Sequence, residues 1–144
     1  MKISEIMTKP VVTIGLDDAV YEIKEIFSHR KIRHIIVVEE AELFGVISER
    51  DLLRALSPSL ESYVYKTQDM AKLNQRVHEI VNRQPISLPI NACIFDVINT
   101  FKTKRVGCIP IVDESNAPVG IITRSDIFRH FDQISANYTI RNNN

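Results

Sequence analysis

The first half of the chain combines a helical stripe of apolar residues with two short apolar runs. Apolar residues recur at helical spacing over 17–27, so we predict a helix with Asp17 or Asp18 as its N-cap. The β-branched run 34–38 and the run 43–47 predict two strands, antiparallel because only a short polar turn separates them. A second helix is predicted from Ser48 to about Leu56, where Ser57-Pro58 ends it.

The second half of the chain repeats this order of elements. A helix is predicted over 91–101 with Asn91 as its cap, followed by strands over 107–112 and 119–122 and by a helix that Thr123 opens. The segment Gly45–Asp51 recurs as Gly120–Asp126, 75 residues later (120 − 45), and the leading segments 3–7 and 77–81 also match. Such repetition indicates two copies of one structural unit.

We therefore expect an α+β (mixed α/β) fold built from two repeats, 1–56 and 77–131. A partly helical linker, 57–76, joins them, with a short helix expected at 67–73, and a tail, 132–144, follows that is frayed from Ser135. Each repeat offers only a small sheet with helices on one face, which cannot bury its apolar face unaided. We expect the two sheets to pack together with pseudo-twofold symmetry and a cleft between the copies.

Composition argues against several classes of partner. Lys and Arg total 18 and balance 18 Asp and Glu, so no net charge attracts nucleic acid. No apolar run approaches the roughly 18 residues of a membrane helix, and the first residues lack the layout of a signal peptide. We therefore expect a cytoplasmic protein with no nucleic-acid or membrane partner.

Cys93 and Cys108 lie in apolar patterns and are expected to be buried, reduced thiols.

The sequence contains no catalytic or metal-binding pattern. Its four glycines form no phosphate-binding loop, its four histidines lack the spacing of metal ligands, and no serine lies in a nucleophile elbow. We therefore expect no enzymatic activity, no metal site and no required cofactor.

The pairs Ser48…Asp51 and Thr123…Asp126 have two interpretations. A hydroxyl residue three positions before a carboxylate is a capping-box pattern, which by itself explains both pairs. The same geometry presents free N–H groups to a phosphate and a carboxylate to a ribose diol. Since a capping hydroxyl can also touch a ligand, the two interpretations are compatible.

Both copies resemble a CBS domain, and the chain resembles a tandem CBS pair, or Bateman module, over about 3–56 and 77–131. In that family a G-h-h-[ST]-x-x-D segment holds the ribose and phosphate of an adenosine ligand. The resemblance thus implies ligand contacts by Ser48, Asp51, Thr123 and Asp126. The segments 13–16 and 87–90 are imperfect matches to the family's T-V-x-P near the adenine.

The two copies differ in the strand that precedes this motif. The family's G-x-x-P-V strand is close to 107–111, so the resemblance places Gly107, Cys108 and Pro110 against adenine. The first copy has Arg33 and His34 where the second has Gly107 and Cys108, and it lacks the proline. The resemblance thus implies a roomier adenine site in the second copy. Phosphate groups would require cations. The candidates are Lys31, Arg33, His34, Lys104, Arg105 and Arg124, with Arg33 and His34 preferred because they open a strand; a solvated surface position is the alternative for each.

Two functions remain open at this point. The first is a sensor that binds AMP, ADP, ATP or S-adenosylmethionine in the cleft and reports to an unidentified effector protein. The second is a homodimerisation or interaction module with degenerate clefts. A homodimer is expected in both cases, because CBS pairs commonly associate through their helices.

Overall fold

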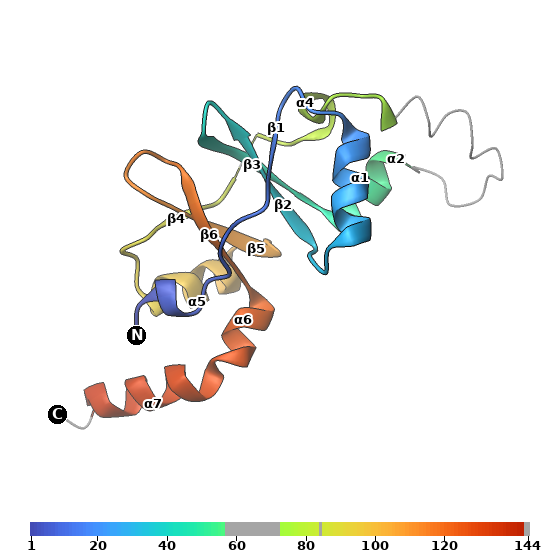
Figure 1. The fold of residues 1–144 in the computed structure, drawn as a ribbon. Helices are drawn as coiled ribbons and strands as arrows, with labels where there is room; N and C mark the ends of the chain where they lie inside the picture. Colours follow the sequence, from blue (N-terminus) through green and yellow to red (C-terminus); the bar gives the residue numbers. More distant parts are fainter. Residues whose placement is uncertain (57–72, 84, 143–144) are drawn as a thin grey trace. The chain divides into compact units, whose positions relative to one another are not determined.

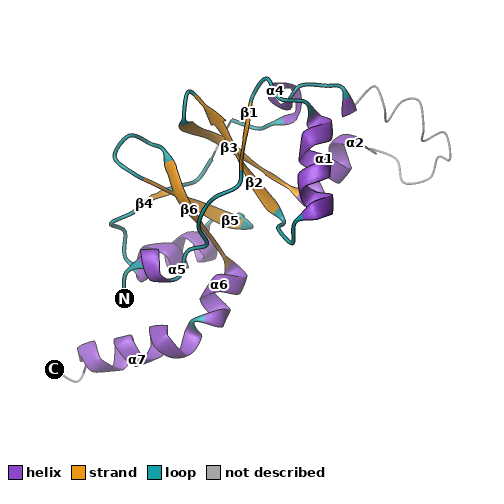
Figure 2. Ribbon diagram, in the orientation of Figure 1, coloured by secondary structure: helices purple, strands orange, loops and turns teal. Residues whose placement is uncertain are grey.

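The computed structural model describes residues 1–56, 73–83 and 85–142 of the 144-residue chain (Figure 1). The chain divides into two compact units, one of Val12–Pro85 and one of Met1–Val11 with Ile86–Asn144. Each unit contains one three-stranded sheet and several helices (Figure 2). The expected helix at 67–73 lies outside the described residues, apart from Leu73.

The unit of residues 12–85 has strand order β1-β2-β3. Strand β1 (Thr13–Gly15) pairs in parallel with β2 (His34–Glu39), which pairs in antiparallel with β3 (Glu42–Ser48). Its described residues form the helices α1 (Val20–His29), α2 (Glu49–Leu56) and α4 (Val77–Ile80). The predicted strand pair is present, whereas β1 escaped prediction because three residues carry no readable periodicity.

The other unit repeats this arrangement with strand order β4-β5-β6. Strand β4 (Leu88–Pro89) is parallel to β5 (Cys108–Val112), and β6 (Pro118–Thr123) is antiparallel to β5. A 3-10 turn, η1 (Ile3–Glu5), and the helices α5 (Ile94–Thr103), α6 (Arg124–Arg129) and α7 (Phe131–Asn142) complete it.

Helix α7 contradicts the expected frayed tail. Its Ile134 is buried, and its Tyr138 ring packs edge-on against Phe95 of α5 with 5.9 Å between the ring centroids. Most other described side chains of α7 are exposed, so the helix lacks the apolar stripe that would have revealed it in the sequence.

The predicted caps of the first helix in each unit were also wrong. Helix α1 begins after Ala19 and α5 after Cys93. The Asp18 carboxylate instead accepts a hydrogen bond from the Gly15 backbone N–H at 2.7 Å and closes the turn before the helix. Cys93 is exposed, which contradicts the expected burial, whereas Cys108 is buried as expected.

The leading segment of each repeat packs on the sheet of the other repeat. Ile3 lies in the same hydrophobic core as Ile109 and Ile122, and Val77 lies in the core of the 12–85 unit. Thr8 and Ile121 exchange two backbone hydrogen bonds, of 2.9 and 3.1 Å, so the first leading segment pairs with β6. The compact units therefore differ from the sequence repeats by this exchange.

The exchange explains why the duplicated motif begins with glycine. A Cβ on Gly45 would lie 2.8 Å from the backbone oxygen of Asn82 and 2.9 Å from Val81 Cγ2. A Cβ on Gly120 would collide with the side chain of Met7. Both glycines thus leave room for a leading segment, and their presence follows from packing alone.

Candidate functional site

The predicted residues of the first repeat lie together at one end of the strands of the first sheet. Because β1 and β2 are parallel and β3 is antiparallel to β2, the beginnings of β1 and β2 lie beside the end of β3. His34 and Ser48 are directly paired residues of β2 and β3. The Glu49 N–H donates to the Arg33 carbonyl oxygen at 2.9 Å, which holds the start of α2 beside the start of β2.

Ser48 and Asp51 form a capping box at the start of α2. The Asp51 N–H donates to Ser48 Oγ at 3.0 Å, and the Ser48 N–H donates to Asp51 Oδ2 at 2.9 Å. The second carboxylate oxygen, Asp51 Oδ1, has no hydrogen-bond partner within the described ranges of the chain. Asp51 is exposed, so this oxygen remains available as an acceptor.

The end of β3 and the start of α2 form a strand-to-helix corner, the first of two in this chain. His34 is electrostatically coupled to this corner. Partial burial lowers the pKa of its imidazole below the ordinary 6.5, the Asp51 charge opposes that shift, and the Arg33 charge adds to it. The ring is therefore neutral near pH 7, and it can act there as a hydrogen-bond donor or acceptor.

The second repeat builds the same corner at the end of β6. Cys108 pairs with Thr123 across β5 and β6, as His34 pairs with Ser48. The Thr123 N–H donates to Asp126 Oδ2 at 2.8 Å, Thr123 Oγ1 donates to the same oxygen at 3.0 Å, and the Asp126 N–H approaches Thr123 Oγ1 at 3.4 Å. Asp126 is 3% exposed, so this corner holds a buried carboxylate.

A model of the CBS domain matches residues 3–58 and 77–133. The chain belongs to the CBS domain family. The two matches confirm the expected tandem CBS pair, and the two small three-stranded sheets with their helices confirm the mixed α/β fold.

Several known proteins are similar to this chain over most of its length. Protein MJ1232 of Methanocaldococcus jannaschii is 28% identical over 90% of this chain and 39% of its own length. The crystal structure of MJ1225 from the same organism has a TM-score of 0.79 and 26% identity, over 92% of this chain and 51% of that one. The cytosolic domain of the Mg²⁺ channel MgtE, in complex with ATP, has a TM-score of 0.69 and 25% identity, over 89% of this chain and 48% of that one. The chain thus spans about half or less of these three relatives.

The remaining implied ligand residues of this CBS pair have different surroundings. Gly107 is exposed just before β5, and Pro110 is buried within β5 opposite Ile121. The Arg124 guanidinium lies 5.6 Å from the centroid of the Phe101 ring, a cation–π contact. Arg124 therefore has a packing role as well as its implied role toward phosphate.

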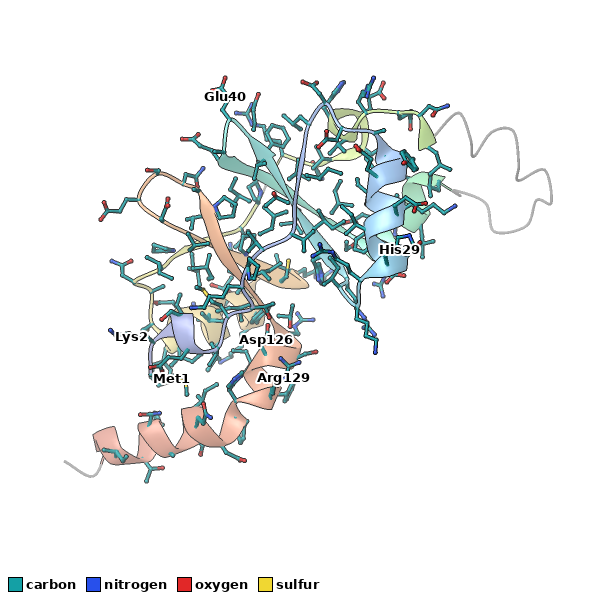
Figure 3. The ribbon with its side chains drawn as sticks, in the orientation of Figure 1. Met1, Lys2, His29, Glu40, Asp126 and Arg129 are labelled. Carbon is teal, nitrogen blue, oxygen red and sulfur yellow. The ribbon has the colours of Figure 1, made fainter. Side chains whose placement is uncertain are left out.

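Arg129 is a residue of the second CBS corner that sequence reasoning missed. Its Nη1 donates to Asp126 Oδ1 at 3.2 Å, and its side chain is 67% exposed (Figure 3). Its i+3 position relative to Asp126 on one helix was the available signal. With this pair, both oxygens of the Asp126 carboxylate are engaged within the chain.

The described residues contain neither a cluster of metal-binding side chains nor a helix that could span a membrane. Within residues 1–56, 73–83 and 85–142, no cluster of His, Cys, Asp and Glu could hold a metal ion. No helix among the same residues combines the length and apolar character needed to cross a membrane.

Proposed function

We propose that this CBS pair is a regulatory module that binds an adenosine-containing small molecule at its strand-to-helix corners. The ligands that we consider are AMP, ADP, ATP and S-adenosylmethionine. The observation that carries the proposal is the duplicated corner. In each unit a serine or threonine ends a strand, and an aspartate three residues later accepts a hydrogen bond from its backbone N–H. The ATP complex of the similar MgtE domain supports this class of ligand.

The chemistry of the first corner suits a sugar and an anion. Asp51 Oδ2 caps α2 and leaves Oδ1 to accept a hydrogen bond from a ribose hydroxyl. Such a bond to a charged acceptor is worth roughly 1.5–3 kcal/mol. Arg33 and the neutral His34 lie beside the same corner and would contact phosphate groups. In the second corner Thr123 and Asp126 would bind the sugar, with Cys108 and Pro110 of β5 and the preceding Gly107 beside the base.

The proposed role is regulatory rather than catalytic. A ligand that favours one conformation of the pair would shift the population of conformations, and an effector protein would read that shift. The effector is unidentified.

Binding to the intact chain tests the proposal. Isothermal titration calorimetry with each of the four ligands should show saturable binding, and charge-removing variants Asp51→Asn and Asp126→Asn should weaken it at least tenfold. Asn is preferred to Ala because its amide oxygen can still accept the capping hydrogen bond. Absence of binding at millimolar ligand, or binding that neither variant changes, would contradict the proposal.

A second candidate function is self-association, and a separate observation favours it. Exposed apolar side chains occupy equivalent positions of the two repeats, Tyr21 and Phe95 on the first helices (50% and 44% exposed) and Leu53 and Phe128 on the helices after the corners (59% and 76%). Such residues are typical of interfaces. Sedimentation velocity should show a homodimer that dissociates in a Leu53→Lys, Phe128→Lys double variant.

A further inference from the structure

We propose that Met7 is an oxidation site, and that conversion of its thioether to the sulfoxide releases the leading segment 3–7 from strand β6. This segment packs in the unit that contains β6, where Ile3 and Ile6 are core residues. The site lies outside the duplicated motif, so it is independent of the proposed ligand.

The sulfur of Met7 fills the space beside the glycine of the second motif. A Cβ on Gly120 would collide with Met7 Sδ and would lie 2.8 Å from its Cγ and 3.1 Å from its Cε. The thioether therefore lies directly against the β6 backbone, and the same side chain packs on the core that contains Ile109 and Ile122. Because Met7 is only partly buried, its side chain is accessible to a small oxidant.

The backbone on both sides of the Met7 side chain is held by hydrogen bonds. The Met7 N–H donates to the Ile3 carbonyl oxygen at 3.0 Å, and Thr8 and Ile121 exchange the backbone bonds of 2.9 and 3.1 Å that pair the chain with β6 (Figure 1). Residue 7 therefore has little freedom to turn away from Gly120 while this pairing persists. A change that drives the Met7 side chain into water should break the pairing as well.

Oxidation is such a change, because it makes an apolar group polar. A peroxide transfers one oxygen atom to the sulfur: the O–O bond breaks, an S–O bond forms, the sulfur loses two electrons, and hydrogen peroxide is reduced to water. The new S–O group requires hydrogen-bond partners, and its burial without them is unfavourable. The unoxidised side chain can shift within an apolar core to make room for a neighbour, whereas the sulfoxide is stable only where water reaches it.

The first repeat has the same arrangement without the sulfur. Val81 lies against Gly45 as Met7 lies against Gly120, and its Cγ2 would be 2.9 Å from a Cβ on Gly45. The Val81 N–H also donates to the carbonyl oxygen of Val77 at 3.0 Å. Of the two side chains that occupy this position, only that of Met7 can be oxidised by a peroxide, so the predicted release is confined to the second sheet.

The test uses the full chain carrying Cys93→Ser, because the exposed thiol of Cys93 also reacts with peroxide. After treatment with hydrogen peroxide, peptide mass spectrometry should show one added oxygen on Met7. Hydrogen exchange followed by NMR should then be at least about tenfold faster at the amides of Thr8 and Ile121, and much less changed at that of Val81. The melting temperature should fall by roughly 3 °C or more.

The matched control is Met7→Leu, which keeps an apolar side chain of similar volume and should show neither change after the same treatment. If that variant does not fold, Met7→Val, which copies Val81, takes its place. Methionine sulfoxide reductases should restore slow exchange in the oxidised chain. The proposal is overturned if Met7 gains no oxygen under peroxide that converts free methionine, if oxidised Met7 leaves exchange at Thr8 and Ile121 unchanged, or if the control responds equally.

Discussion

Replacing the two motif aspartates with alanine should have unequal effects on stability. Asp126 receives three donors, two from Thr123 at 2.8 and 3.0 Å and one from Arg129 at 3.2 Å, and it is 3% exposed. Asp51 receives the Ser48 N–H at 2.9 Å and is exposed. Asp126→Ala therefore leaves polar groups in a part-buried corner without an acceptor, whereas water can replace the Asp51 carboxylate.

The magnitudes follow from these contacts. A hydrogen bond to a charged group contributes about 1.5–3 kcal/mol, but the two Thr123 donors share one oxygen and their effects do not add. The exposed Arg129 contributes at most about 1 kcal/mol. We expect Asp126→Ala to lower the free energy of unfolding by about 2–4 kcal/mol, and Asp51→Ala by about 1 kcal/mol, the usual cost of a lost cap.

Urea unfolding followed by circular dichroism provides the measurement, with the midpoint shift converted through the m-value. Asp126→Asn is the control, because its amide oxygen keeps an acceptor for the Thr123 N–H and should recover about half of the loss. Equal destabilisation by the two alanine variants would refute the idea that the buried Asp126 carboxylate stabilises the fold. So would a loss of less than about 1 kcal/mol in the free energy of unfolding for Asp126→Ala.

Three further predictions concern packing and pH. Gly45→Ala should lower the melting temperature more than Gly120→Ala, because the added Cβ meets the Asn82 backbone oxygen at 2.8 Å rather than a flexible side chain; overpacking of this kind costs about 1–3 kcal/mol. Ile3→Ala should cost about 2–5 kcal/mol in urea unfolding, because Ile3 is fully buried; an exposed, uncoupled leading segment would show no loss. NMR titration should place the pKa of His34 below 6.5. The imidazole of His34 then binds a proton at a higher pH in the unfolded chain than in the folded chain. The free energy of unfolding should therefore fall as the pH drops below about 6.5, and it should fall less in His34→Gln.

The sequence revealed those elements whose residues carry a strong local pattern. The β-branched residues of β2 and the duplicated motif predicted both hairpins and the helices after them. Strands β1 and β4, with three and two residues, are set by backbone pairing to a neighbour and leave no such pattern. The caps were misread for a similar reason, because Asp18 bonds backward to Gly15 instead of forward into the helix.

The exchange of leading segments was beyond sequence reasoning because the repeats are similar. Residues 3–7 and 77–81 have equivalent patterns, so either segment would satisfy either core by composition alone. The choice appears only in three dimensions, where Ile3 joins the core of β5 and β6, and Val77 joins that of β2 and β3. Arg129 was missed because an arginine three residues after an aspartate is common on helix surfaces, and this spacing becomes informative only when the aspartate is known to be buried.

The structure also separates what the duplicated motif needs for folding from what it offers a ligand. The glycine is accounted for by the leading segment packed against it, and the hydroxyl and one carboxylate oxygen are accounted for by the cap. The second carboxylate oxygen is not required by either, and the two repeats treat it differently. Among the described residues Asp51 Oδ1 has no hydrogen-bond partner, while Asp126 Oδ1 accepts a hydrogen bond from Arg129. The two corners therefore differ at this oxygen, and they also differ in the residues that begin the preceding strand, Arg33 and His34 in one and Gly107 and Cys108 in the other.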